Sequence, residues 1–209
     1  MSSTRVQHQP LLDWNVASRT LAGQKVSGDM RLVEWFHHGV LLAAIDGVGH
    51  GEEAVFAAQT AVDVLRDHAQ ESVISLFRRC HDKLTKTRGV VMTLASLSAL
   101  EGTLTWLGVG NVEGRLLRAE PGAGHPRENL LLRSGLVGYQ LPVLQAGVVP
   151  LSAGDVMIFA TDGVHPGFAE GINLKQSPNP IAENILNEYF IGTDDALVLV
   201  ARYRGMTHE

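Results

Sequence analysis

The chain has 209 residues, of which 45% are hydrophobic and 19% charged, a composition typical of one globular domain and not of a disordered or fibrous chain. Its formal net charge of −5 offers no basic surface for nucleic acid or for an anionic membrane. The single cysteine, Cys80, excludes an intramolecular disulfide and favours a reducing, cytoplasmic compartment.

The ends and the apolar runs of the chain indicate a single domain without a membrane segment. Residues 1–10 are polar, lack the apolar region of a signal peptide, and predict a flexible N-terminal tail. Apolar runs such as 40–45 and 196–201 are far shorter than the ~18 residues that a membrane-spanning helix needs. We therefore expect one domain over residues 1–209.

The first half of the chain alternates between strand and helix patterns. Short strands are predicted at 14–21 and 31–37, and the continuous apolar run 40–45 predicts a strand that is buried on both faces. Apolar residues then recur at intervals of three and four, which predicts one-sided helices over 52–68 and 71–84.

From residue 90 onward the pattern is mostly that of strands, interrupted by a loop over 122–128 and a helix over 180–189 that has prolines at its start. This order of elements predicts an α+β fold with antiparallel sheets. The strands predicted in this half are 91–100, 103–109, 112–118, 130–132, 142–149, 155–160 and 196–202.

Aspartates occur at four ends of predicted apolar strands, three of them beside glycine. They are found in Gly28-Asp29, Asp46-Gly47, Asp162-Gly163 and Asp194-Asp195. Any one Asp-Gly pair is explained as a turn. Charged residues are costly in a core, however, and four such positions favour a functional site at one end of a sheet.

The chemistry of these residues suits hard divalent cations. Carboxylates, backbone carbonyls and water are the ligands that Mg²⁺ and Mn²⁺ prefer, whereas soft sites need clusters of Cys and His. Two such ions about 4 Å apart can activate a water molecule and hold a phosphoryl group. The residues therefore favour a site for hard divalent cations.

The order of these motifs resembles a known enzyme family. Residues 44–51 read Ala-Ile-Asp-Gly-Val-Gly-His-Gly, with Gly28-Asp29 before them and Thr-Asp-Gly-Val at 161–164 and Asp194-Asp195 after them. This pattern resembles the type 2C metal-dependent protein phosphatases, in the bacterial branch related to SpoIIE and RsbU. Further segments are similar in order and spacing to the RsbX-like stressosome phosphatases, namely 87–91, 108–112 and 134–139.

The resemblance extends from about residue 14 to residue 204 and implies a fold and a set of metal ligands. The fold is a four-layer α/β/β/α sandwich of two antiparallel sheets flanked by helices, with the metal site at one end of the sheets. Asp46 would bridge two ions, Mn²⁺ or Mg²⁺, and Gly47 would provide its backbone carbonyl. Asp46 and Asp162 would be catalytic through a water molecule activated by the ions. The remaining ligands implied are Asp29, Asp162 and Asp194.

Four further residues bear on this site. Asp195 is an additional candidate ligand, and His50 is a candidate hydrogen-bond or proton donor to the phosphate, or else shapes the loop that starts the helix. Met30 follows Asp29 where many family members carry a further acidic residue, which predicts a weaker first metal corner. Arg19 lies in the region where larger eukaryotic members have a phosphate-binding arginine, but we do not place it in the site.

The resemblance implies hydrolysis of phosphoserine or phosphothreonine on partner proteins. The implied substrates are phosphorylated STAS-domain proteins of the stressosome, of the RsbS and RsbR kind, and the implied role is to reset a bacterial stress signalling complex. Two alternatives remain open: a non-catalytic module of the same fold that binds phosphoproteins, and a metal-dependent hydrolase of small phosphate esters.

Overall fold

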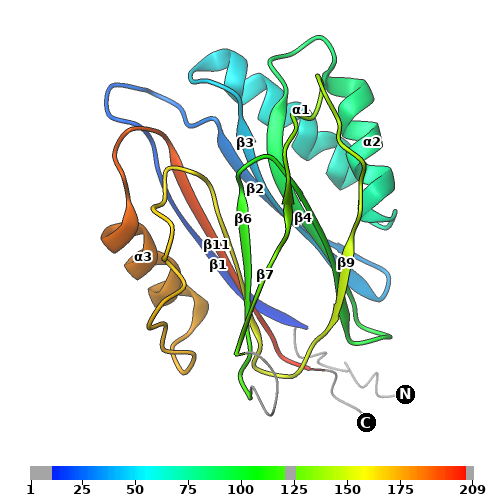
Figure 1. Cartoon of the computed structure of the whole chain (residues 1–209), viewed down its shortest axis with the longest axis vertical. Helices are drawn as coiled ribbons and strands as arrows, with labels where there is room; N and C mark the ends of the chain where they lie inside the picture. The colour runs from blue at the N-terminus through cyan, green and yellow to red at the C-terminus, as the bar shows by residue number, and fades with distance from the viewer. Residues whose placement is uncertain (1–10, 121–125, 206–209) are drawn as a thin grey trace, which may run out of the picture.

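The computed structural model describes residues 11–120 and 126–205. The predicted tail at 1–10 and the first part of the predicted loop at 122–128 lie outside these residues. Two β-sheets face each other, and helices cover both outer faces, which confirms the predicted four-layer α+β sandwich (Figure 1).

The strands of each sheet come from distant parts of the sequence. All pairings are antiparallel except that of β5 with β8. The first sheet has the order β1 (Leu12–Arg19), β11 (Ala196–Tyr203), β10 (Val156–Ala160), β6 (Glu113–Leu117) and β7 (Arg127–Asn129). The second has the order β2 (Asp29–Phe36), β3 (Gly39–Gly47), β4 (Val90–Ser98), β5 (Thr103–Val109) and β8 (Leu132–Arg133), with β9 (Gly147–Pro150) also paired to β5.

Strand β3 is buried on both faces, as its continuous apolar run predicts. Leu41 and Ile45 pack toward the helices, whereas Leu42 and Ala44 pack between the two sheets. Alternation along a strand sends successive side chains to opposite faces, so a strand covered on both sides is apolar throughout. The Asp46-Gly47 pair at the end of β3 is therefore anchored in a strand that is packed on both faces.

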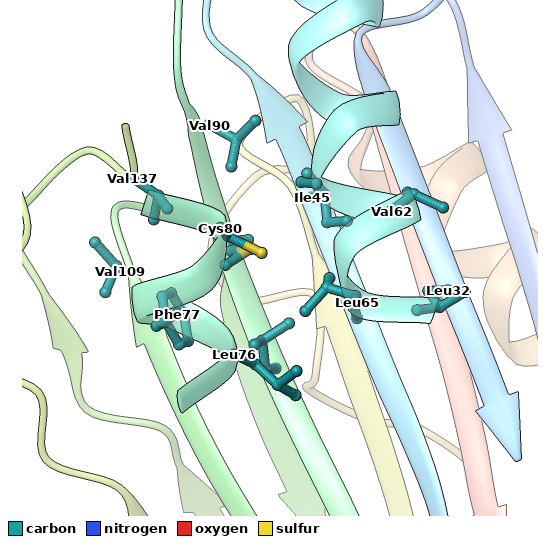
Figure 2. Close-up of a cluster of buried hydrophobic side chains, with 14 of the residues drawn as sticks. Leu32, Ile45, Val62, Leu65, Leu76, Phe77, Cys80, Val90, Val109 and Val137 are labelled. Carbon is teal, nitrogen blue, oxygen red and sulfur yellow. The ribbon is translucent and has the colours of Figure 1, made fainter. Parts of the chain in front are cut away.

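Helices α1 (Glu52–Asp67) and α2 (Val73–Leu84) cover the second sheet, and α3 (Pro178–Tyr189) covers the first. Figure 2 shows the side chains of Leu65 from α1 and Phe77 from α2 in the cluster that joins these helices to the sheet. Cys80 belongs to the same cluster and is fully buried, and burial raises the pKa of its thiol to about 12. No helix within the described residues has the length and apolar character needed to cross a membrane.

Three predicted segments differ from the structure. The predicted strand 130–132 coincides with a strand only at Leu132, where β8 begins, and Leu130 instead packs in the core between the sheets. Residues 127–129, predicted as loop, form the edge strand β7, whose Arg-Glu-Asn sequence has no apolar alternation because the strand lies at the margin of the sheet. Of the predicted strand 142–149, only the part from Gly147 onward is a strand. Leu141, Leu144 and Ala146 instead pack on the helix-covered core without joining a ladder, so apolar content alone misled the prediction.

Candidate metal centre

Both sheets bring predicted site residues to the same end of the sandwich. Asp29 begins β2 and is paired across the ladder with Asp46 near the end of β3. Asp162 follows β10, and Asp194-Asp195 immediately precede β11, the antiparallel neighbour of β10. The start of β1 and the end of β11 lie at the opposite end (Figure 1).

The glycines of the Asp-Gly pairs are required by close packing. A Cβ added to Gly47 would lie 2.2 Å from the carbonyl oxygen of Ala54 in α1. A Cβ added to Gly163 would lie 2.0 Å from the carbonyl oxygen of Asp195. Neither glycine has a positive φ. Asp162 and Gly163 nevertheless lie in a turn, which the hydrogen bond from the amide of Val164 to the carbonyl of Thr161 closes at 3.1 Å. Both glycines mark places where neighbouring segments contact the end of β3, which carries Asp46, and the turn that carries Asp162.

Asp29 is buried in the junction between the sheets, with 9% of its surface exposed. Its Oδ2 accepts a hydrogen bond from the Thr161 hydroxyl at 2.7 Å, and that hydroxyl oxygen accepts one from the amide of Leu197 at 2.8 Å. Burial, and next the charge of Asp46, raise the pKa of Asp29 to about 8. A carboxylate from the second sheet is thus fixed by a hydroxyl from the first.

The other carboxylates are close enough to repel one another. Burial, followed by the charges of Asp162, Asp194 and Asp195, raises the pKa of Asp46 to about 7. The pKa of Asp162 is raised by burial and by Asp194, while a hydrogen bond from Asn111 Nδ2 at 2.7 Å opposes the shift. Negative charge is therefore concentrated at this end of the molecule.

The two consecutive aspartates before β11 have different surroundings. Asp195 is 3% exposed, its Oδ1 accepts from the amide of Leu21 and its Oδ2 from the amide of Gly28, both at 2.7 Å. Asp194 is exposed, and its Oδ1 accepts from the amide of Asp195 at 2.8 Å. Asp195 therefore fixes the segment that leads into Asp29, while Asp194 remains accessible. His50 is exposed in the loop between β3 and α1.

The donor set suits a divalent cation in its chemistry. Within 11–120 and 126–205, no three His, Cys, Asp or Glu side chains lie close enough together to enclose one ion. The carboxylates instead accept hydrogen bonds from Thr161, Asn111 and backbone amides. Yet burial and neighbouring carboxylates raise the pKa values of Asp29, Asp46 and Asp162. Together with Asp194 and the backbone of Gly47, they are hard oxygen donors whose repulsion a dication would relieve.

Comparison with known proteins identifies the family. The model of the family described as stage II sporulation protein E (SpoIIE) matches residues 37–204. The chain belongs to the SpoIIE family. The predicted resemblance to the type 2C protein serine/threonine phosphatases is thereby confirmed.

Individual relatives agree with this membership. This SpoIIE-family chain is 24% identical over 179 residues to the phosphoserine phosphatase RsbX of Bacillus subtilis, covering 85% of this chain and 87% of RsbX. The crystal structure of RsbX in complex with magnesium is similar with a TM-score of 0.81 at 22% identity, covering 94% of this chain and 96% of RsbX.

Two further solved structures are similar. One is a solved structure described as the bacterial stressosome, a modular system adapted to control secondary messenger signaling. Its TM-score is 0.82 at 28% identity, and the match covers 91% of this chain and 99% of that one. The catalytic domain of the serine/threonine phosphatase PstP in complex with two manganese ions gives 0.68 at 16% identity, covering 92% and 98%.

Two residues beside the carboxylates were not among the predicted site residues. Asn111 follows β5 and donates to Asp162, and Thr161 donates to Asp29 from the other sheet. Each lies in a motif that the sequence singled out, Gly-Val-Gly-Asn at 108–111 and Thr-Asp-Gly at 161–163. A polar residue within two positions of the end of an apolar strand is the signal that finds them, since such a position lies at the same end of the sandwich.

Proposed function

We propose that this SpoIIE-family chain is a Mn²⁺- or Mg²⁺-dependent phosphatase that removes phosphate from phosphoserine or phosphothreonine of stressosome STAS-domain proteins, of the RsbS and RsbR kind. The observation that carries the proposal is the meeting of Asp29 and Asp46 from one sheet with Asp162 and Asp194 from the other. The similarity to RsbX and to a chain from the stressosome supports the substrate class.

The residues that would hold two ions are Asp29, Asp46, the carbonyl of Gly47, Asp162 and Asp194. When bound, the ions supply positive charge that activates water and neutralises phosphoryl oxygens. The chain itself orients these ligands: Thr161 fixes Asp29, and Asn111 fixes Asp162.

Asp195 and Cys80 have other roles in this proposal. Asp195 positions the backbone of Gly28, and with it the start of β2, rather than contacting an ion. Cys80 is fully buried with a thiol pKa of about 12, so the described residues offer no cysteine nucleophile. We therefore expect direct attack of water on phosphorus and no covalent phosphoenzyme.

We also propose that the chain is a single domain in the cytoplasm. The helix-covered core and the inter-sheet core share strand β3, which supports one cooperative unit. The free thiol of Cys80 suits a reducing compartment.

A second candidate is a phosphoprotein-binding module without turnover. One observation favours it: among the described residues, no three candidate ligands are grouped tightly enough to enclose an ion. If this candidate holds, the protein binds a phosphorylated STAS-domain protein but releases no phosphate with Mn²⁺.

The test is phosphate release from a phosphorylated STAS-domain protein, compared with release from a small aryl phosphate, each with Mn²⁺ and with chelator. We expect Mn²⁺-dependent release that is faster for the phosphoprotein. Binding without release identifies the module, and a preference for the aryl phosphate identifies a hydrolase of small esters. Recovery of a stable phosphoenzyme would rule out direct attack by water.

A further inference from the structure

The connection between α2 and β4 is fixed against the loop that follows Asp46. The amide of Val48 donates to the carbonyl of Gly89 at 3.2 Å, which continues the ladder of β3 and β4 beyond its last pair. The amide of Gly89 donates to Thr87 Oγ1 at 3.0 Å, and that hydroxyl donates to the carbonyl of Leu84 at 2.8 Å. The backbone on both sides of Arg88 is therefore held next to the loop over residues 48–51, which is called the metal loop below.

The side chain of Arg88 lies over this loop. A Cβ added to Gly49 would come within 2.6 Å of Arg88 Nη1, so the guanidinium rests on the backbone three residues beyond Asp46. Arg88 Nε donates to Glu53 in the first turn of α1. Both side chains are largely exposed, at 49% and 69%, and an exposed ion pair contributes little to stability.

The guanidinium also borders an open cavity. Arg88, Lys86 and Phe56, together with Thr87 and the first-turn glutamates of α1, line a volume of about 550 Å³. Phe56 is 64% exposed there. A substrate segment approaching the metal loop from this side meets the Arg88 guanidinium.

Arg19, in the region where larger family members have a phosphate-binding arginine, contacts α3 and the residue that follows it. Its Nη2 donates to Asn187 Oδ1 in α3 at 3.0 Å, and its Cζ lies 4.8 Å from the centroid of the Phe190 ring. These contacts hold Arg19 at the junction with α3.

We propose that Arg88 binds the phosphoryl group of the substrate and that Glu53 occupies its guanidinium when no substrate is bound. A phosphate dianion approaching a cluster of aspartates needs a cation that those aspartates do not neutralise. A guanidinium binds phosphate through two parallel hydrogen bonds, and a dianion competes favourably with one exposed carboxylate. This inference rests on the proposed phosphatase function and names the residue that positions its substrate.

The variants that test it are Arg88→Ala, Arg88→Lys and Glu53→Gln, with Arg79→Ala as matched control. Arg79 forms a comparable ion pair with Glu71 at 2.7 Å, and its side chain is also 49% exposed, but it lies on α2. Removing it therefore reports the loss of a surface ion pair alone.

Two measurements separate phosphate binding from a structural effect. The first is KM and kcat on a phosphorylated STAS-domain protein with Mn²⁺. The second is the rise in Tm that inorganic phosphate causes in the Mn²⁺-loaded protein. We expect Arg88→Ala to raise KM at least about tenfold and to abolish the phosphate-induced rise, while the Mn²⁺-induced rise persists. Arg88→Lys should be intermediate, because lysine binds phosphate as a point charge, and Glu53→Gln should lower KM about two- to threefold.

Two outcomes overturn the proposal: an Arg88→Ala protein that matches Arg79→Ala in both measurements, or one whose loss follows only from lost Mn²⁺ binding. The phosphatase function fails on a separate result, namely absence of Mn²⁺-dependent release by the wild-type protein. In that case the phosphate-induced rise in Tm still decides whether Arg88 binds phosphate.

Discussion

Strand β10 has an aspartate at each end, and the two aspartates have opposite surroundings. Asp155, just before the strand, is fully buried, and its Oδ2 accepts from Arg118 Nη1 at 2.8 Å and from the amide of Ser152 at 3.0 Å. Asp162, just after the strand, is exposed and lies near Asp194, with Asn111 as its side-chain partner.

The difference separates a carboxylate that stabilises the fold from one that is a candidate for function. At the Asp155 end, the Arg118 guanidinium pairs with the fully buried Asp155 and also with the half-buried Glu128, so the buried carboxylate meets a cation. At the Asp162 end, burial raises the pKa of Asp46, and the charged groups that add to this shift are other carboxylates. Unneutralised charge is costly to the fold, and perturbed carboxylates that gather at one end of a sandwich are candidates for function.

The largest expected effect comes from Asp46→Asn at the unneutralised end. The change removes a charge that would be shared by two ions, so Mn²⁺-dependent phosphate release should fall at least about a hundredfold. The metal-free protein should be as stable as wild type or more stable at pH 8, because burial and neighbouring carboxylates disfavour the Asp46 charge. Phosphate release in excess Mn²⁺ and chemical denaturation with chelator check both points. Wild-type release by this variant would remove Asp46 from the site.

Asp155→Asn tests the neutralised end of the same strand. It replaces a fully buried carboxylate with an amide and leaves the half-buried Arg118 paired with Glu128 alone, and hydrogen bonds to charged groups contribute about 1.5–3 kcal/mol each. The free energy of unfolding should fall accordingly, while the Mn²⁺-induced rise in Tm is retained. Urea denaturation with and without Mn²⁺ distinguishes the two ends, and loss of the metal response in this variant would contradict the comparison.

The sequence predicted the fold better than it predicted the surroundings of single side chains. Periodicity located the three helices and the buried strand β3, because covered faces require apolar residues at fixed intervals. It failed at Arg127–Asn129 and at 142–146, where an edge strand is polar and an apolar segment packs without a ladder. Whether these residues form a strand depends on whether the fold places another strand beside them, which local sequence does not show.

The candidate site shows the same limit. Order along the chain indicated Asp29, Asp46 and Asp162, since strand ends collect at the end of a sheet. The resemblance placed Asp194 ahead of Asp195 as a ligand, but the sequence could not show what Asp195 binds. The amides of Leu21 and Gly28, from which Asp195 accepts hydrogen bonds, are more than 160 positions away. Nor could it show that Arg88 rests on Gly49.

The pH dependence of stability should also distinguish the two ends. The folded-state pKa values of Asp29, about 8, and Asp46, about 7, exceed the unfolded value of about 4. Between pH 4 and pH 8 the folded state therefore binds more protons, and the stability of the metal-free protein falls as pH rises. We expect a loss of several kcal/mol from pH 5 to pH 8, because both carboxyl groups change from protonated to ionised in the folded state over this range. Denaturation across this range should show a clearly flatter profile for a variant with both Asp29→Asn and Asp46→Asn; an unchanged slope would mean that these groups ionise normally.

Divalent cations should reverse part of that loss, with the smallest of the four effects. A ligand that binds only the folded state stabilises it by about 2.7 kcal/mol at a hundredfold excess over Kd, which for a chain of this size raises Tm by about 5–10 °C. Mn²⁺ should act more strongly than Mg²⁺, because Mg²⁺ gives up water reluctantly and requires stricter octahedral geometry. Met30, in place of a further acidic residue after Asp29, predicts that one ion binds tightly and the second only at high concentration.

Thermal melts across titrations of each ion check this in wild type, Asp162→Ala and Asp155→Asn. The rise should be lost in Asp162→Ala and kept in Asp155→Asn; if wild type melts at the same temperature at every Mn²⁺ concentration, the unneutralised end of β10 is not a metal site.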